Sequence, residues 1–99
     1  MPKINESAEV SLEIQEPDMY QVLLHNDDYT SMDFVVEILM KVFHKNIQDA
    51  ETIMIMIHEK GSAICGLYSY EIAQTKAQQV KKLARQNEFP LLATIEKDL

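Results

Sequence analysis

The sequence has one cysteine, two glycines and three prolines among its 99 residues, and each scarcity excludes a class of protein. The single cysteine, Cys65, cannot form a disulfide within the chain and fits a reducing compartment. So few glycines and prolines exclude a linker or a fibrous chain. The hydrophobic fraction of 46% is instead normal for a globular protein, and the length suits one domain.

Basic residues are also scarce. The chain has nine Lys and Arg against 16 Asp and Glu, which gives a formal net charge of −7. Nucleic acids and anionic membranes both require clustered Lys and Arg, so we expect neither as a partner. No apolar run approaches the roughly 20 residues of a membrane-spanning helix, and residues 1–18 lack the apolar region of a secretory signal. The sequence therefore predicts a soluble cytoplasmic protein.

The negative charge is concentrated at the start of the chain. The first 18 residues hold five of the 16 acids and one of the nine bases, so they carry −4 and the remainder carries −3. Few large apolar residues occur there, and Pro17 closes the segment. We predict that residues 1–17 form a flexible acidic tail and that residues 18–99 form the folded domain. A weak edge strand over residues 10–14 is the alternative.

Apolar patterning beyond residue 18 predicts strands at 19–24, 63–68 and 91–95, separated by three helices. The first helix is expected to be capped by Thr30 and to end near His44. The second is expected to start at Asn46 and stop at Gly61, and the third to run from Ser69 to about Asn87. This β-α-α-β-α-β order predicts an α+β fold, a small two-layer sandwich with a three-stranded antiparallel sheet packed on three helices.

One polar cluster, residues 25–30 (HNDDYT), lies between the first predicted strand and the first predicted helix. Loops of this kind often carry function. Adjacent Asn and Asp side chains could hold a cation, either a metal ion or an amine, and are poorly suited to an anion. A strand-to-helix turn with a cap explains the same residues equally well.

His58 is the second candidate. On a helix, Met54, Ile57 and His58 share one face, and methionine suits adaptable binding pockets. A lone histidine beside apolar residues is nevertheless more often a packing residue than a ligand. The three histidines lack a metal-ligand spacing, and Cys65 lies in an apolar run where a buried thiol is usually inert. We therefore expect no metal, no cofactor and no enzyme signature.

Three motifs stand in order along the chain: residues 26–35 read NDDYTSMDFV, residues 63–66 read AICG and residues 87–92 read NEFPLL. They resemble the motifs NDDYTPMEFV, AICG and NEHPLL of the ClpS family of Clp protease adaptors. Their order and spacing agree over about four fifths of the chain. Ser31 replaces the usual Pro, which predicts some loss of rigidity without a lost contact. Phe89 replaces a common His.

The resemblance implies a non-catalytic adaptor for N-degrons, meaning destabilising N-terminal residues such as Leu, Phe, Tyr or Trp. It would deliver such proteins to the unfoldase ClpA, or ClpC, for degradation by ClpP. The substrate α-amino group would be held by Asn26, Asp28 and His58. The pocket for the first side chain would be formed by Asp27, Thr30, Met32, Val35, Ile38, Met54, Ile57 and Leu91.

The resemblance also implies a gatekeeper and a docking contact. Met32 would exclude the β-branched residues Ile and Val from the pocket. Glu71 and Lys76 would contact the N-terminal domain of the unfoldase, and the tail would act in the handover. The alternative with the same fold is a protein-interaction domain resembling the C-terminal domain of the ribosomal stalk protein, which lacks the NDDYT loop. An enzyme is the third hypothesis.

Overall fold

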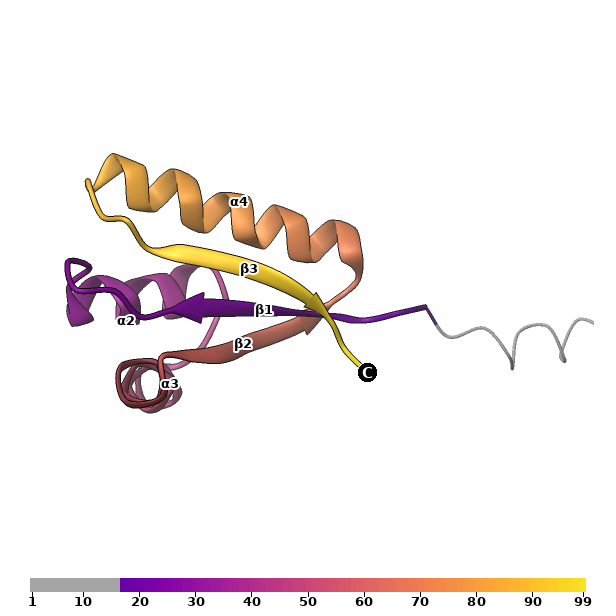
Figure 1. Ribbon diagram of the computed structural model, residues 1–99, viewed down its shortest axis with the longest axis horizontal. Coiled ribbons are helices and arrows are strands. Elements are labelled where there is room, and N and C mark those ends of the chain that lie inside the picture. Colours follow the sequence, from indigo (N-terminus) through magenta and orange to yellow (C-terminus); the bar gives the residue numbers. More distant parts are fainter. Residues whose placement is uncertain (1–16) are drawn as a thin grey trace, which may run out of the picture.

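The computed structural model describes residues 17–99, and the predicted acidic tail, together with the alternative strand at 10–14, lies outside these residues except for Pro17. The described chain contains three strands and three helices in the predicted order (Figure 1). They are β1 (Tyr20–His25), α2 (Met32–Lys41), α3 (Ile47–Lys60), β2 (Ser62–Tyr68), α4 (Tyr70–Gln86) and β3 (Leu92–Lys97). The sheet has the order β2-β1-β3 with both pairs antiparallel, so the predicted fold class is confirmed.

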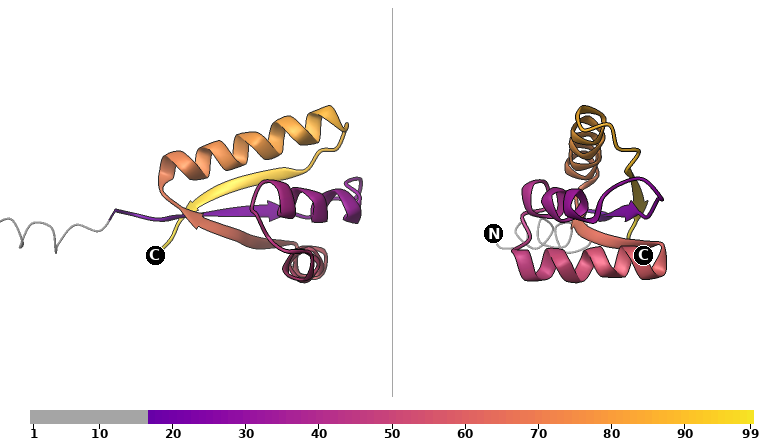
Figure 2. Two further views of the ribbon diagram at one scale, coloured as in Figure 1. Left: turned by 180° about the vertical axis from the view of Figure 1, so that it is seen from behind. Right: turned by 90° about the vertical axis from the view of Figure 1, so that its left-hand side faces the viewer.

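The helices and the sheet form two layers around one core. Helix α4 packs against all three strands, whereas α3 packs against β2 and α2. Figure 2 shows α2 and α4 on the same side of the strands, with α3 crossing beside β2. Val22 and Leu24 of the central strand are fully buried, while His25 lies on the opposite face and bonds the Thr94 hydroxyl at 2.7 Å. The alternation of side chains along β1 therefore defines the core face.

The start of α2 differs from the sequence-based expectation. Ser31, not Thr30, is the N-cap, and its Oγ accepts a hydrogen bond from the Phe34 amide at 3.1 Å. A proline at this position has no side-chain acceptor, so the serine gains a contact worth about 1 kcal/mol rather than only losing rigidity. The helix also ends earlier than expected, at Lys41, because the chain turns through a left-handed residue, His44 (φ 58°).

Helix α3 begins and ends as predicted. The Asn46 side chain accepts from the Asp49 amide at 2.8 Å, and Gly61 ends the helix in the left-handed conformation (φ 93°). Ser69 occupies the N-cap position of α4, although its side chain makes no capping hydrogen bond. Both predicted helix starts therefore lie at the right residue, and the stop at Gly61 is confirmed.

Strand β2 contains a bulge at the AICG motif. Val22 is paired with Gly66 and Leu23 with Ile64, so Cys65 has no partner in the register. A Cβ at Gly66 would overlap the Tyr68 ring, so a larger residue at this position would require that ring to move. Burial raises the pKa of the Cys65 thiol to about 12, so the group stays protonated and packs as a small apolar side chain.

Candidate functional site

The loop between β1 and α2 is folded by Asp27. Its Oδ1 accepts hydrogen bonds from the amides of Tyr29 (2.8 Å) and Thr30 (2.7 Å), and its Oδ2 accepts from the Thr30 hydroxyl (2.7 Å). An aspartate that accepts from amides two and three residues ahead fixes a tight turn. Thr30 therefore serves the loop and not the helix cap, which corrects the role expected from the sequence.

The Asp27 carboxyl is charged at neutral pH. Its partial burial acts to raise the pKa, but the hydrogen bonds from Thr30 and Tyr29 together outweigh burial, so the pKa lies below its ordinary value of 3.8. These three bonds occupy lone pairs of both carboxylate oxygens. Asp27 therefore shapes the loop more than it offers an acceptor to a ligand.

A backbone hydrogen bond holds the loop beside helix α3. The Asn26 backbone N–H donates to the Gly61 carbonyl at 2.8 Å. Because Gly61 directly follows α3 and donates back to the Ile57 carbonyl at 2.9 Å, the loop is fixed against the last turn of that helix. This turn carries His58. Residues 26–28 and His58, about 30 positions apart in sequence, are thereby brought together.

A cavity of about 270 Å³ lies where the loop, α2 and α3 meet. Its polar wall contains Asn26, Asp28 and His58, all exposed, and no hydrogen bond found within residues 17–99 uses these three side chains. The apolar part includes Ile57 (2% exposed) and the half-exposed Met32 (49%). The complete lining is Asn26, Asp27, Asp28, Thr30, Met32, Val35, Met54, Ile57 and His58.

This lining contains all three residues expected for the amine and six of the eight expected for the side-chain pocket. The other two lie elsewhere. Ile38, one turn further along α2 than Val35, is 1% exposed and packs in the core. Leu91 is 6% exposed and lines a separate cavity between α4 and β3. His25, part of the polar cluster, faces the other side of the sheet and is also absent from the lining.

The residues expected to contact an unfoldase have different surroundings on α4. Glu71 is exposed in the first turn. Lys76 is half-buried, and its Nζ donates to the Val42 carbonyl at 2.8 Å and lies 5.6 Å from the Tyr68 ring centroid. Lys76 therefore ties α4 to the end of α2. Glu71 and Lys76 do not share a face of α4, because they are five positions apart on the helix.

Sequence reasoning missed the structural role of Asp27. The signal was present, because an Asp followed three residues later by a Thr is a common spacing for a side chain that closes a turn. Within residues 17–99 no group of three or more His, Cys, Asp or Glu could hold a metal ion. No helix in the same range is long and apolar enough to cross a membrane.

Comparison with known proteins identifies the relatives of this chain. Residues 15–94 match the family model described as ATP-dependent Clp protease adaptor protein ClpS. The ClpS adapter of Syntrophus aciditrophicus (strain SB) is 54% identical over 83 residues, which cover 84% of this chain and 78% of the relative. That of Shewanella halifaxensis (strain HAW-EB4) is 53% identical over 94 residues, 95% of this chain and 90% of the relative.

The fold comparison agrees. The structure of Agrobacterium tumefaciens ClpS2 bound to L-phenylalaninamide matches with a TM-score of 0.81 and 36% sequence identity. The match covers 84% of this chain and 100% of the other. With a family model that spans most of the sequence and relatives above 50% identity, the chain belongs to the ClpS family of ATP-dependent Clp protease adaptors.

Proposed function

We propose that this Clp protease adaptor captures proteins by a free, bulky N-terminal residue in the cavity between the β1–α2 loop and α3, and delivers them for unfolding and degradation. The observation that carries the proposal is the pairing of three uncommitted polar side chains with an apolar floor in one cavity. The ligand of the Agrobacterium relative, L-phenylalaninamide, supports it. That molecule carries a free α-amine and a phenyl side chain, the two groups such a cavity would read.

The polar wall suits an α-ammonium group. An ammonium has three N–H donors, and Asn26 Oδ1, the Asp28 carboxylate and a neutral imidazole nitrogen of His58 are three acceptors. Hydrogen bonds that involve a charged group contribute roughly 1.5–3 kcal/mol each. An acetylated N-terminus has one N–H and no charge, so it cannot replace the amine.

The apolar part suits one large side chain. Burial of a Leu or Phe side chain contributes roughly 1.5–3 kcal/mol, which is similar to one amine contact. After the cost of association, the two halves together give binding of about micromolar strength, and neither half suffices alone. Met32 stands half-exposed at the start of α2 and lines this cavity. There it would clash with a β-branched residue, whose second γ carbon lies next to the backbone.

Delivery requires a partner, and family membership makes that partner a component of the Clp protease system. We propose the N-terminal domain of ClpA or ClpC, contacted through the exposed Glu71. A contact through Lys76 would first have to release its bond to the Val42 carbonyl. We further propose that the protein acts in the cytoplasm and catalyses nothing itself. The buried Cys65 thiol, with a pKa of about 12, is unsuited to nucleophilic attack.

The test is a titration of the full-length protein with fluorescent peptides that begin with Leu, Phe or Tyr, each beside an N-acetylated control. We expect acetylation to weaken binding at least about 100-fold, because it removes two charge-assisted bonds or more. Asp28→Asn should weaken binding of the peptides that have a free amine. Asp49→Asn, an equal charge change in the first turn of α3, should leave their binding unchanged. Binding that survives acetylation would reject the mechanism.

A further inference from the structure

Helix α4 carries a basic surface on an otherwise acidic protein. Residues 72–87 contain four bases and no acid, although the whole chain has a net charge of −7. Lys76 is used internally, and the other three, Lys81, Lys82 and Arg85, are exposed. The two ion pairs found within residues 17–99 involve other lysines, Lys41 and Lys97. No described carboxylate therefore neutralises these three cations.

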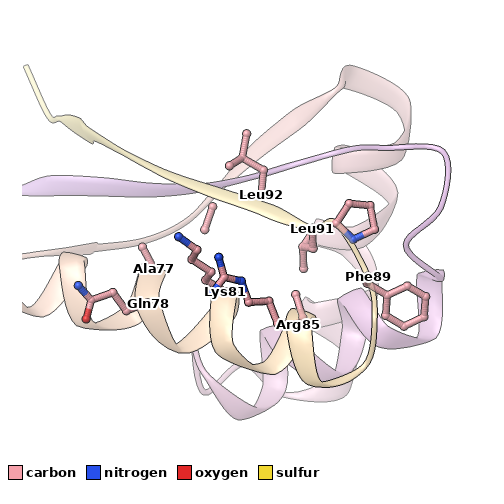
Figure 3. A pocket seen from close by; sticks show the side chains of 10 residues that line it. Ala77, Gln78, Lys81, Arg85, Phe89, Leu91 and Leu92 are labelled. Carbon is pink, nitrogen blue, oxygen red and sulfur yellow. The ribbon is translucent and has the colours of Figure 1, made fainter.

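The basic surface borders a cavity that the proposed site does not use. It lies between α4 and β3, has a volume of about 400 Å³, and shares no lining residue with the cavity beside α3. Figure 3 shows the side chains of Lys81 and Arg85 extending from α4 into the space beside β3, with Leu91 next to them. Ala84 and Leu91 supply a buried apolar floor. This chemistry fits a peptide segment that carries both carboxylates and apolar side chains.

The chain itself contains such a segment outside the described residues. Residues 6–16 hold four glutamates and no base, and three of these glutamates alternate with apolar residues over residues 9–16 (EVSLEIQE). We propose that this acidic N-terminal segment docks in the groove between α4 and β3. Its glutamates face Lys81 and Arg85, and its apolar side chains cover the floor at Leu91.

The attachment point allows this docking. The segment joins β1 at Tyr20, whose ring lies 5.0 Å from that of Tyr70, the first residue of α4. Lys81 and Arg85 are 11 and 15 residues further along the helix, about 16 and 22 Å away. Glu13 lies seven residues before Tyr20, and an extended chain covers roughly 3.3 Å per residue, so about 23 Å is within its reach.

Tethering makes even weak docking effective. A short linker holds the segment near the groove at an effective concentration on the order of millimolar, so modest ion pairs and partial apolar burial suffice. An acidic segment of another protein would have to bind from dilute solution against this internal competitor. The same surface charge makes the docking sensitive to salt, because exposed ion pairs are screened.

The experiment is paramagnetic relaxation enhancement on the full-length protein, with a nitroxide label at Ser11→Cys. The buried Cys65 thiol, with its pKa of about 12, resists the reagent. We expect amide broadening concentrated at residues 77–85 and 91–93 and lost in 0.5 M NaCl. Broadening that is absent, centred on another surface, or unaffected by salt would overturn the proposal.

Charge substitutions separate this docking from simple proximity. K81Q/R85Q should lower the equilibrium constant between the undocked and docked segment roughly twofold to thirtyfold, the range expected for two exposed ion pairs. K41Q/K60Q, which removes the same charge from exposed lysines that do not line the groove, should leave the broadening unchanged. K81E/R85E should abolish the broadening at residues 77–85 and 91–93. Adding E9K/E13K to the K81E/R85E protein should restore it. Equal broadening in K81Q/R85Q and K41Q/K60Q, or failed restoration, would contradict the assignment. The proposal is independent of the peptide-binding cavity.

Discussion

Asp27 is the residue whose removal we expect to disorder the binding loop while leaving the fold intact. Asp27→Ala deletes three hydrogen bonds of 2.7–2.8 Å, two to backbone amides and one to the Thr30 hydroxyl. Bonds to a charged group contribute roughly 1.5–3 kcal/mol each, and the partly exposed position lets water replace much of this. We take about 2 kcal/mol as the loss in loop ordering, which corresponds to about a 30-fold loss of peptide affinity.

The assay is isothermal titration with a peptide that begins with Phe, paired with urea unfolding of the same variants. Affinity should fall about 30-fold while the free energy of unfolding changes by no more than about 2 kcal/mol, because Asp27 contacts the loop and not the core. Asp49→Asn, in the first turn of α3, is the control and should bind normally. Wild-type affinity in Asp27→Ala would refute the view that this carboxylate holds the loop.

The acid response of Asp27 follows from its lowered pKa. A carboxyl whose folded pKa lies below the unfolded value stabilises the folded state fully above the unfolded value, and the contribution is lost as pH falls through the folded pKa. The ordinary value is 3.8, so the contribution of Asp27 to stability should be constant between pH 5 and 8 and decline only below about pH 4. The stability difference between wild type and Asp27→Asn, measured by urea unfolding across this range, checks the prediction.

Three further predictions concern neighbouring side chains. Met32→Ala should admit peptides that begin with Ile or Val, and unchanged discrimination in a peptide titration would contradict the gatekeeper role. His58→Ala should weaken binding of a Phe peptide at least about tenfold, because the ammonium loses one of its three acceptors. An unchanged affinity in the peptide titration would remove His58 from the site. Ser31→Ala should lower the free energy of unfolding by about 1 kcal/mol in urea, because the Phe34 amide loses its capping acceptor. A decrease of less than a few tenths of a kcal/mol would contradict a stabilising cap.

Local signals in the sequence were sufficient where one residue decides the outcome. Asn46 and Gly61 were placed correctly because a capping side chain and a left-handed glycine act within a few residues. The cap of α2 was misplaced because two adjacent hydroxyl residues compete, and Asp27 engages Thr30. The end of α2 was placed too late because Val42 and Phe43 are buried beyond the helix and continue its apolar pattern.

The site itself depends on contacts between distant segments. Spacing alone left Asn26, Asp28 and His58 as separate candidates, and the family resemblance joined them into one site. The structure brings them to one cavity through the Asn26–Gly61 backbone hydrogen bond, which no local pattern encodes. Whether an apolar residue lines a cavity or fills the core is likewise decided by packing, as Ile38 and Leu91 illustrate.

The most direct measurement is the place where a minimal ligand binds. Intermolecular nuclear Overhauser effects from the ring protons of L-phenylalaninamide to side chains of the full-length protein would locate it. We expect contacts to Val35, Met54 and Ile57, together with amide shifts at residues 26–28 and 58. Contacts to Leu91 and the larger cavity beside α4 would contradict it.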